Sequence, residues 1–160
     1  MAEDTRPVLV AYDASDEAKG AVRQAATLFP ARPLVVVSVW EPGLAAMAAM
    51  PGVDTVGVAY PPDPVEVAEI DRAQRDHAKD VSEAGADLAR GLGATAEPLS
   101  VPDEADVAAT IAAIADERDA CAIVVGSRGL GRIRARLLGS TSQGLLHHTQ
   151  RPVLVVRAGD

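Results

Sequence analysis

Residues 7–29, PVLVAYDASDEAKGAVRQAATLF, contain one complete strand, turn and helix pattern. The apolar run Pro7–Ala11 is short and rich in β-branched residues, which is typical of a buried strand. Turn-forming residues follow, and Ser15 or Asp16 is placed to cap a helix. Apolar residues then recur at helical spacing until Pro30 ends the helix.

The same alternation of strand and helix continues along the chain. Near-continuous apolar runs fit parallel strands that are covered on both faces, and right-handed crossovers between them favour an open, doubly wound α/β sheet. Further strands are predicted at residues 34–39, 94–100, 122–126 and 152–156, and further helices at 63–90, 103–118 and 140–148. Pro98 predicts an edge position for the third strand. The length fits a single domain over residues 1–160, with about four helices flanking five strands.

The long helix over residues 63–90 is expected to pack through an apolar stripe on one face. The stripe consists of Val67, Ile70, Ala73, Ala78, Val81, Ala84 and Leu88. Residues 41–62, before this helix, hold four prolines and three glycines without sustained periodicity. They are interpreted either as a variable loop or as a lid over a ligand.

Composition excludes several classes of protein. The net charge is −8 and only four of the 160 residues are aromatic, which argues against nucleic-acid binding. A single cysteine, Cys121, excludes a disulfide framework and is expected in the core. The polar, acidic start and the lack of a long apolar run predict a cytoplasmic protein without a membrane span.

Ligands of open parallel sheets bind beyond the carboxyl ends of the strands, which directs attention to Asp13, to residues 40–41 and to residues 126–129. Glycines after the fourth strand follow the pattern G-x2-G-x9-G-S, at Gly126, Gly129 and Gly139. The first two are expected to allow close approach of a ligand and a positive φ.

Residues 139–142, Gly-Ser-Thr-Ser, begin the last helix, where free N–H groups and hydroxyls form an anion site. Two segments that can bind through their backbone, residues 126–129 and 139–142, together suit a polyphosphate. The alternative interpretation of the same residues is a glycine-rich turn followed by an ordinary Ser N-cap. The P-loop, the dinucleotide fingerprint and the nucleophile elbow are absent from the sequence.

On these residues the chain resembles the universal stress protein family, in its ATP-binding branch. The resemblance rests on the glycine pattern with Ser140, on the turn Tyr12-Asp13-Ala14-Ser15, and on the ending Arg151–Val156. It implies a sheet of order 3-2-1-4-5 and a homodimer in which the last strands pair antiparallel. It also implies a regulatory role in stress, with a slow adenine-nucleotide hydrolase and a dimeric interaction module as alternatives.

The ligand implied by the resemblance is ATP, with or without magnesium. Asp13 would meet the nucleoside end, directly or through a metal, and Val39 would line the adenine pocket. Ribose and phosphates would be held by Gly126, Gly129, Gly139, Ser140 and Thr141. Arg128 is interpreted either as a phosphate partner or as an exposed arginine. The family often has glycine where this chain has Ala14, whose methyl group narrows the turn.

Other polar residues are assigned no chemistry. His147 and His148 are adjacent on a helix and poorly placed to chelate together, and His77 has no partner in the sequence pattern. No catalytic residue and no metal ligand is therefore assigned.

The terminal strand, residues 152–156, would expose an apolar sheet edge in a monomer, which independently predicts a homodimer through this strand.

The charge is unevenly distributed along the sequence, since residues 126–160 carry a net charge of +5 and the remainder −13. Four arginines lie in or beside the segment assigned to phosphates, where positive potential attracts an anion, although residues 132–136 could equally form a solvated face.

Overall fold

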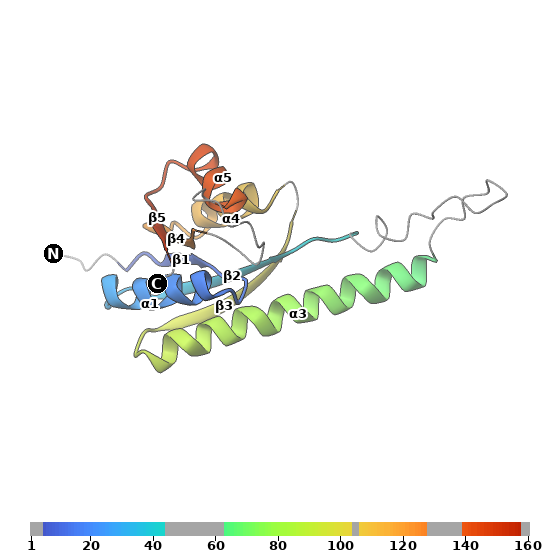
Figure 1. Ribbon diagram of the computed structural model, residues 1–160, viewed down its shortest axis with the longest axis horizontal. Coiled ribbons are helices and arrows are strands. Elements are labelled where there is room, and N and C mark those ends of the chain that lie inside the picture. Colours follow the sequence, from blue (N-terminus) through green and yellow to red (C-terminus); the bar gives the residue numbers. More distant parts are fainter. Residues whose placement is uncertain (1–4, 44–62, 104–105, 128–138, 158–160) are drawn as a thin grey trace.

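The computed structural model describes residues 5–43, 63–103, 106–127 and 139–157 (Figure 1). Within these ranges, five strands form one sheet in the order β3-β2-β1-β4-β5. The strands are β1 (Val8–Ala11), β2 (Leu34–Trp40), β3 (Ala96–Pro102), β4 (Ala122–Gly126) and β5 (Val153–Val156). All neighbouring strands are parallel, so the predicted doubly wound sheet and its order are confirmed.

Helices cover both faces of the sheet. The described helices are α1 (Asp16–Leu28), α3 (Pro64–Gly91), α4 (Val107–Glu117) and α5 (Ser140–His148). Figure 1 shows α4 and α5 together on one side of the strands and α1 and α3 on the other. Across the helices that the structure describes, no stretch is both long and apolar enough to span a bilayer.

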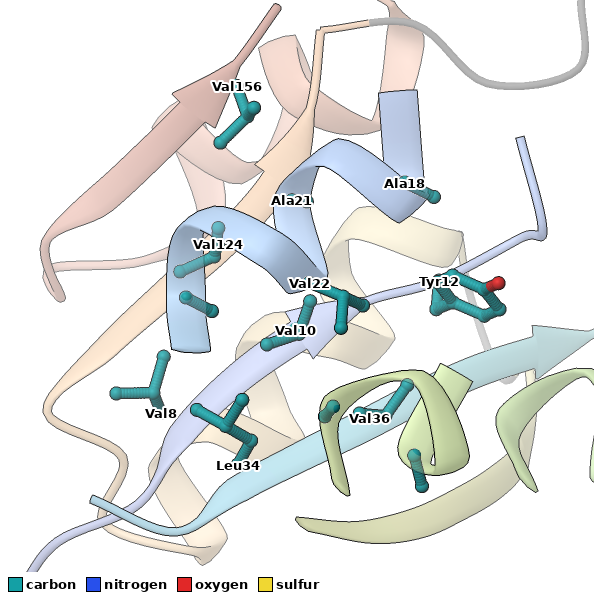
Figure 2. Packing of buried hydrophobic residues seen from close by; sticks show 13 residues of the cluster. Val8, Val10, Tyr12, Ala18, Ala21, Val22, Leu34, Val36, Val124 and Val156 are labelled. Carbon is teal, nitrogen blue, oxygen red and sulfur yellow. The ribbon is translucent and has the colours of Figure 1, made fainter. Parts of the chain in front are cut away.

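Successive residues of each strand enter different cores, as the period of two requires. Val8 and Val10 belong to the core under α1 and α3, whereas Leu9 belongs to the core under α4 and α5. Figure 2 shows the first core, with Val10 beneath α1 and Val36 next to α3. Both cores are built largely of aliphatic side chains, in agreement with the low aromatic content.

The predicted packing stripe of α3 is partly wrong. Ile70, Ala73 and Ala84 are exposed. The buried residues of α3 are instead small: Ala78, Ser82, Gly85, Ala86 and Ala89. A Cβ atom on Gly85 would lie 2.7 Å from both Tyr12 Cδ1 and Val36 Cγ1, so the helix lies too close to the sheet for larger side chains. The first turns of α3 extend beyond the strands (Figure 1).

Three element boundaries differ from the prediction by two residues or more. The third strand spans Ala96–Pro102 rather than residues 94–100, and the following helix begins at Val107 rather than at residue 103. The N–H group of Asp103 donates to the Trp40 carbonyl at 2.7 Å, which extends the pairing with β2. The helix begins later because the Asp106 carboxylate caps it. The edge position expected from Pro98 is confirmed.

Candidate functional site

The site lies where the sheet reverses its winding direction, between β1 and β4. These strands pair in the register Val10 with Val124, so their carboxyl ends meet at the same edge. Asp13 follows β1 and Ser127 follows β4. Brought together at the topological switch point, these two turns occupy the usual ligand position of such folds.

The turn after β1 is held by its own side chains. The Ser15 N–H group donates to Asp13 Oδ1 at 3.0 Å, and Ser15 Oγ accepts from the Ala18 N–H group at 3.1 Å. Ser15 is therefore the N-cap of α1, and half-buried Asp13 is fixed at the end of the strand. Ala14 between them has a φ of 64°, a conformation that favours glycine.

Gly126 serves the packing of α1. Its predicted positive φ is wrong, since among the described glycines only Gly43 and Gly93 have one. A Cβ atom at Gly126 would lie 2.8 Å from Glu17 Cβ and 3.1 Å from the Ala18 nitrogen. The absence of a side chain therefore lets the first turn of α1 approach the end of β4.

The end of β4 and the start of α5 are directly bonded. The Gly139 N–H group donates to the Ser127 carbonyl at 2.6 Å, and the Ser127 N–H group donates to the Val156 carbonyl at 2.7 Å. The two outer parts of the glycine-rich pattern are thus neighbours in space. Gly139, with a φ of −63°, is the N-cap of α5, so the alternative of a Ser N-cap is wrong.

Among the four described helices, α5 differs at its N-terminus. In the other three helices, the side chain of the N-cap residue accepts a hydrogen bond from a backbone N–H group. These residues are Ser15 for α1, Asp63 for α3 and Asp106 for α4. Gly139 has no side chain to do so, and residues 140–143 include no acid. The first three N–H groups of a helix lack internal acceptors, and the helix dipole makes this end positive. Ser140 is exposed and Thr141 half-buried, so this end of α5 is suited to an anion.

The outcome for the remaining predicted site residues is mixed. Arg128 and Gly129 lie outside the described residues, as do residues 44–62 of the long loop. Val39 is half-buried near the end of β2 and packs against the core under α4 and α5. The contact of Ser127 with Gly139 was missed, because no local pattern signals a bond between residues twelve positions apart.

The histidines and the cysteine lie apart from this site. His148 Nε2 is 3.4 Å from Asp106 Oδ2, between α5 and α4. Cys121 is half-buried against the core under α1, close to the expected core position. Over the described part of the chain, no group of three or more histidine, cysteine and acidic residues is arranged to hold a metal.

Comparisons with known proteins agree with this fold. A universal stress protein of Mycobacterium tuberculosis is 32% identical over 156 residues, which cover 96% of this chain and 48% of that protein. The chain thus spans about half the length of the curated relatives it matches. The structure of UspA from Lactobacillus plantarum is 22% identical with a TM-score of 0.72, covering 98% of this chain and 100% of that one.

A second similar structure is the universal stress protein from Archaeoglobus fulgidus in complex with dAMP. It is 24% identical with a TM-score of 0.60, covering 94% of this chain and 96% of that one. Both structures share the fold described above. Residues 4–157 match the sequence pattern of the universal stress protein family. With nearly its whole length matched, the chain belongs to the universal stress protein family.

Proposed function

We propose that this protein binds an adenine nucleotide, ATP, at the switch point and acts as a cytoplasmic regulatory protein in the stress response. The observation that carries the proposal is the N-terminus of α5, which has a glycine cap and is bonded to the end of β4. A positive helix end without a side-chain cap, at the edge of a parallel sheet, suits a phosphate chain. The dAMP complex of the Archaeoglobus fulgidus protein, which has the same fold, supports a nucleotide as the ligand.

The proposed contacts follow the order of the strands. The phosphates take the backbone N–H groups and hydroxyls of Ser140 and Thr141 beside Gly139, with Arg128 and Gly129 contributing from the segment after β4. Asp13, fixed by its bond from Ser15, meets the nucleoside end. Val39 lies on strand β2, next to β1, and lines the adenine pocket. Gly126 contributes by letting the first turn of α1 lie close to the end of β4. Magnesium would accompany the phosphates.

The first experiment identifies the ligand and its affinity. Mass spectrometry of the small molecules released on denaturation should detect an adenine nucleotide. Addition of Mg-ATP at about 100 times its Kd should stabilise the fold by about 2.7 kcal/mol, seen as a raised melting temperature. A melting temperature that neither ATP nor ADP changes would contradict the proposal.

A variant separates binding from folding. Gly139→Asp keeps a backbone conformation open to any residue and adds a carboxylate that caps the free N–H groups. The variant should be as stable as the wild type or slightly more so, and should lose ATP affinity because the carboxylate repels phosphate. Gln24→Glu adds the same charge on an exposed position of α1 and should bind ATP normally. Equal affinity in both variants would place the phosphates elsewhere.

Phosphate release distinguishes a binding protein from a hydrolase. A regulatory protein should release phosphate more slowly than about 1 s⁻¹, the lower end of ordinary enzyme turnover. Faster release would favour the alternative of an adenine-nucleotide hydrolase.

The proposed assembly is a homodimer in which two β5 strands pair antiparallel. β5 is an edge strand, and its apolar residues Val153, Leu154 and Val155 are only half-buried. The carbonyls of Pro152 and Val156 accept hydrogen bonds from Ile123 of β4 and from Ser127 just after it. The alternation along a strand therefore directs the backbone groups of Val153 and Val155 outward.

This assembly is tested by analytical ultracentrifugation at micromolar concentration. The wild type should sediment as a dimer, and Val155→Pro, which removes an outward N–H group without breaking the pairing with β4, should sediment as a monomer. A monomeric wild type would contradict the proposed dimer.

A further inference from the structure

Ser142 is a buried polar residue at the edge of the candidate site. Its side chain is only 1% exposed, although it lies in the first turn of α5 next to exposed Ser140. The hydroxyl donates to the Gly139 carbonyl at 2.9 Å, and the same oxygen lies 3.5 Å from the Ser127 carbonyl. The sequence pattern places this hydroxyl among the anion-binding groups, but its burial and its acceptors show that it bonds to the protein.

The two carbonyl groups next to the Ser142 hydroxyl belong to Gly139 and Ser127, the residues that join α5 to the end of β4. Ser127 accepts from the Gly139 N–H group at 2.6 Å and donates its own N–H group to Val156 at 2.7 Å. The hydroxyl of Ser142 thus lies where the first turn of α5 meets the end of β4. At the same place, Ser127 bonds to the edge strand β5. Because the hydroxyl donates to the Gly139 carbonyl, it does not act as a side-chain cap for the N–H groups at the start of α5.

We propose that Ser142 is a positioning residue for the nucleotide site, which rests on the function proposed above. Anion binding by backbone N–H groups requires that these groups hold one orientation relative to the rest of the site before the ligand arrives. The buried Ser142 hydroxyl supplies part of that restraint through its bond to the Gly139 carbonyl, while the more exposed Ser140 and Thr141 contact the phosphates.

The chain offers a close control in Ser82 of α3. Its side chain is also 1% exposed, and its hydroxyl also donates to the carbonyl three residues earlier, Lys79, at 2.9 Å. Ser82→Ala and Ser142→Ala therefore remove the same group from the same local hydrogen bond at equal burial. They differ in place, since α3 packs on β2 and β3 rather than against the end of β4.

The test measures the Kd for Mg-ATP by isothermal titration calorimetry together with the melting temperature of each variant. Ser142→Ala should bind ATP about tenfold more weakly, an effect of the size expected for one lost hydrogen bond near a charged ligand. Ser82→Ala should stay within about twofold of the wild type, while the melting temperatures of the two variants fall by similar amounts. Ser142→Thr, which keeps the hydroxyl, should recover most of the affinity.

Two results overturn the proposal while the proposed function stands. One is wild-type affinity in Ser142→Ala, and the other is an equal loss of affinity in Ser82→Ala. A wild-type protein that binds no ATP would overturn the proposed function and this inference with it.

Discussion

The amide group of Gly139 donates a hydrogen bond to the carbonyl oxygen of Ser127 at 2.6 Å. This bond joins the start of α5 to the end of β4 across the eleven residues 128–138. It brings a helix N-terminus without a side-chain cap to the switch point of the sheet, where the turn containing Asp13 also lies. The proposed nucleotide site depends on this relationship more than on any single side chain.

Replacing Ala14 with glycine should stabilise the protein. A φ of 64° costs an L residue about 1–2 kcal/mol, and glycine removes that strain at an entropic cost of about 0.4–1 kcal/mol. Ala14→Gly should therefore raise the free energy of unfolding by up to about 1 kcal/mol in urea titrations. Ala14→Val, β-branched at the same φ, should lower it. An Ala14→Gly variant less stable than the wild type would show that the turn is not strained.

Two glycines of α3 should respond oppositely to alanine. Gly85→Ala places a Cβ atom 2.7 Å from Tyr12 and Val36, and such overpacking destabilises by about 1–3 kcal/mol. At Gly91, the last residue of α3, the structure has open space, so Gly91→Ala should raise the free energy of unfolding by up to about 0.5 kcal/mol through helix propensity. Urea midpoints of the two variants should move in opposite directions. A Gly85→Ala midpoint that does not fall would mean that α3 can move away from the sheet at little cost.

Arg151 should contribute more to stability than Arg118. Arg151 Nε lies 2.7 Å from Asp116 Oδ1, and its Nη1 bonds to Asp119 and to the Ala120 carbonyl. The hydrogen bond to Asp116 raises the pKa of the Arg151 guanidinium, which stays charged in both states.

Arg151→Met should lower the free energy of unfolding by about 1–2 kcal/mol, because hydrogen bonds of a charged, mostly buried group are lost. The side chain of Arg151 is 20% exposed, whereas that of Arg118, paired with Glu97, is 43% exposed. Arg118→Met should change stability by less than about 0.5 kcal/mol. Similar urea midpoints for both variants would refute the difference.

Stability should fall above about pH 10 because of Tyr12. Burial, the largest cause, raises the pKa of the Tyr12 hydroxyl above its usual value of 10.0. As the pH rises past 10, the unfolded chain releases this proton while the folded chain retains it. Deprotonation therefore stabilises the unfolded state, and the free energy of unfolding falls. Urea titrations from pH 8 to 11 should show a smaller decline for Tyr12→Phe than for the wild type. Parallel declines would mean that the hydroxyl titrates alike in both states.

The alternation of elements was predictable because strands and helices leave different apolar periods in the sequence. Buried strands such as Val8–Ala11 and caps such as Ser15 are local features, and the structure has both. The edge position of the strand containing Pro98 followed from the missing N–H group of proline. Gly139, Ser140 and Thr141 could be proposed as site residues because a helix N-terminus is also a local feature, and the structure has a helix that begins at Ser140.

The packing distances were not predictable in the same way. The apolar pattern of α3 suggested that Ile70 and Ala84 face the sheet, yet the buried face contains Gly85 and Ala86. Periodicity identifies an apolar stripe but does not state how close two layers lie. A helix in near-contact with Tyr12 selects small residues, whichever stripe is more hydrophobic.

The sequence by itself determined the class of sheet, the order of its elements and the glycine pattern on which the proposed anion site rests. Only the tertiary structure decided which groups remain available at that site. It showed that Gly126 packs against α1, that the Ser142 hydroxyl is buried, and that Gly139 lies on Ser127. The physical reason is that strand and helix propensities act over a few neighbouring residues, whereas a hydrogen bond or a van der Waals contact depends on where distant segments of the chain meet.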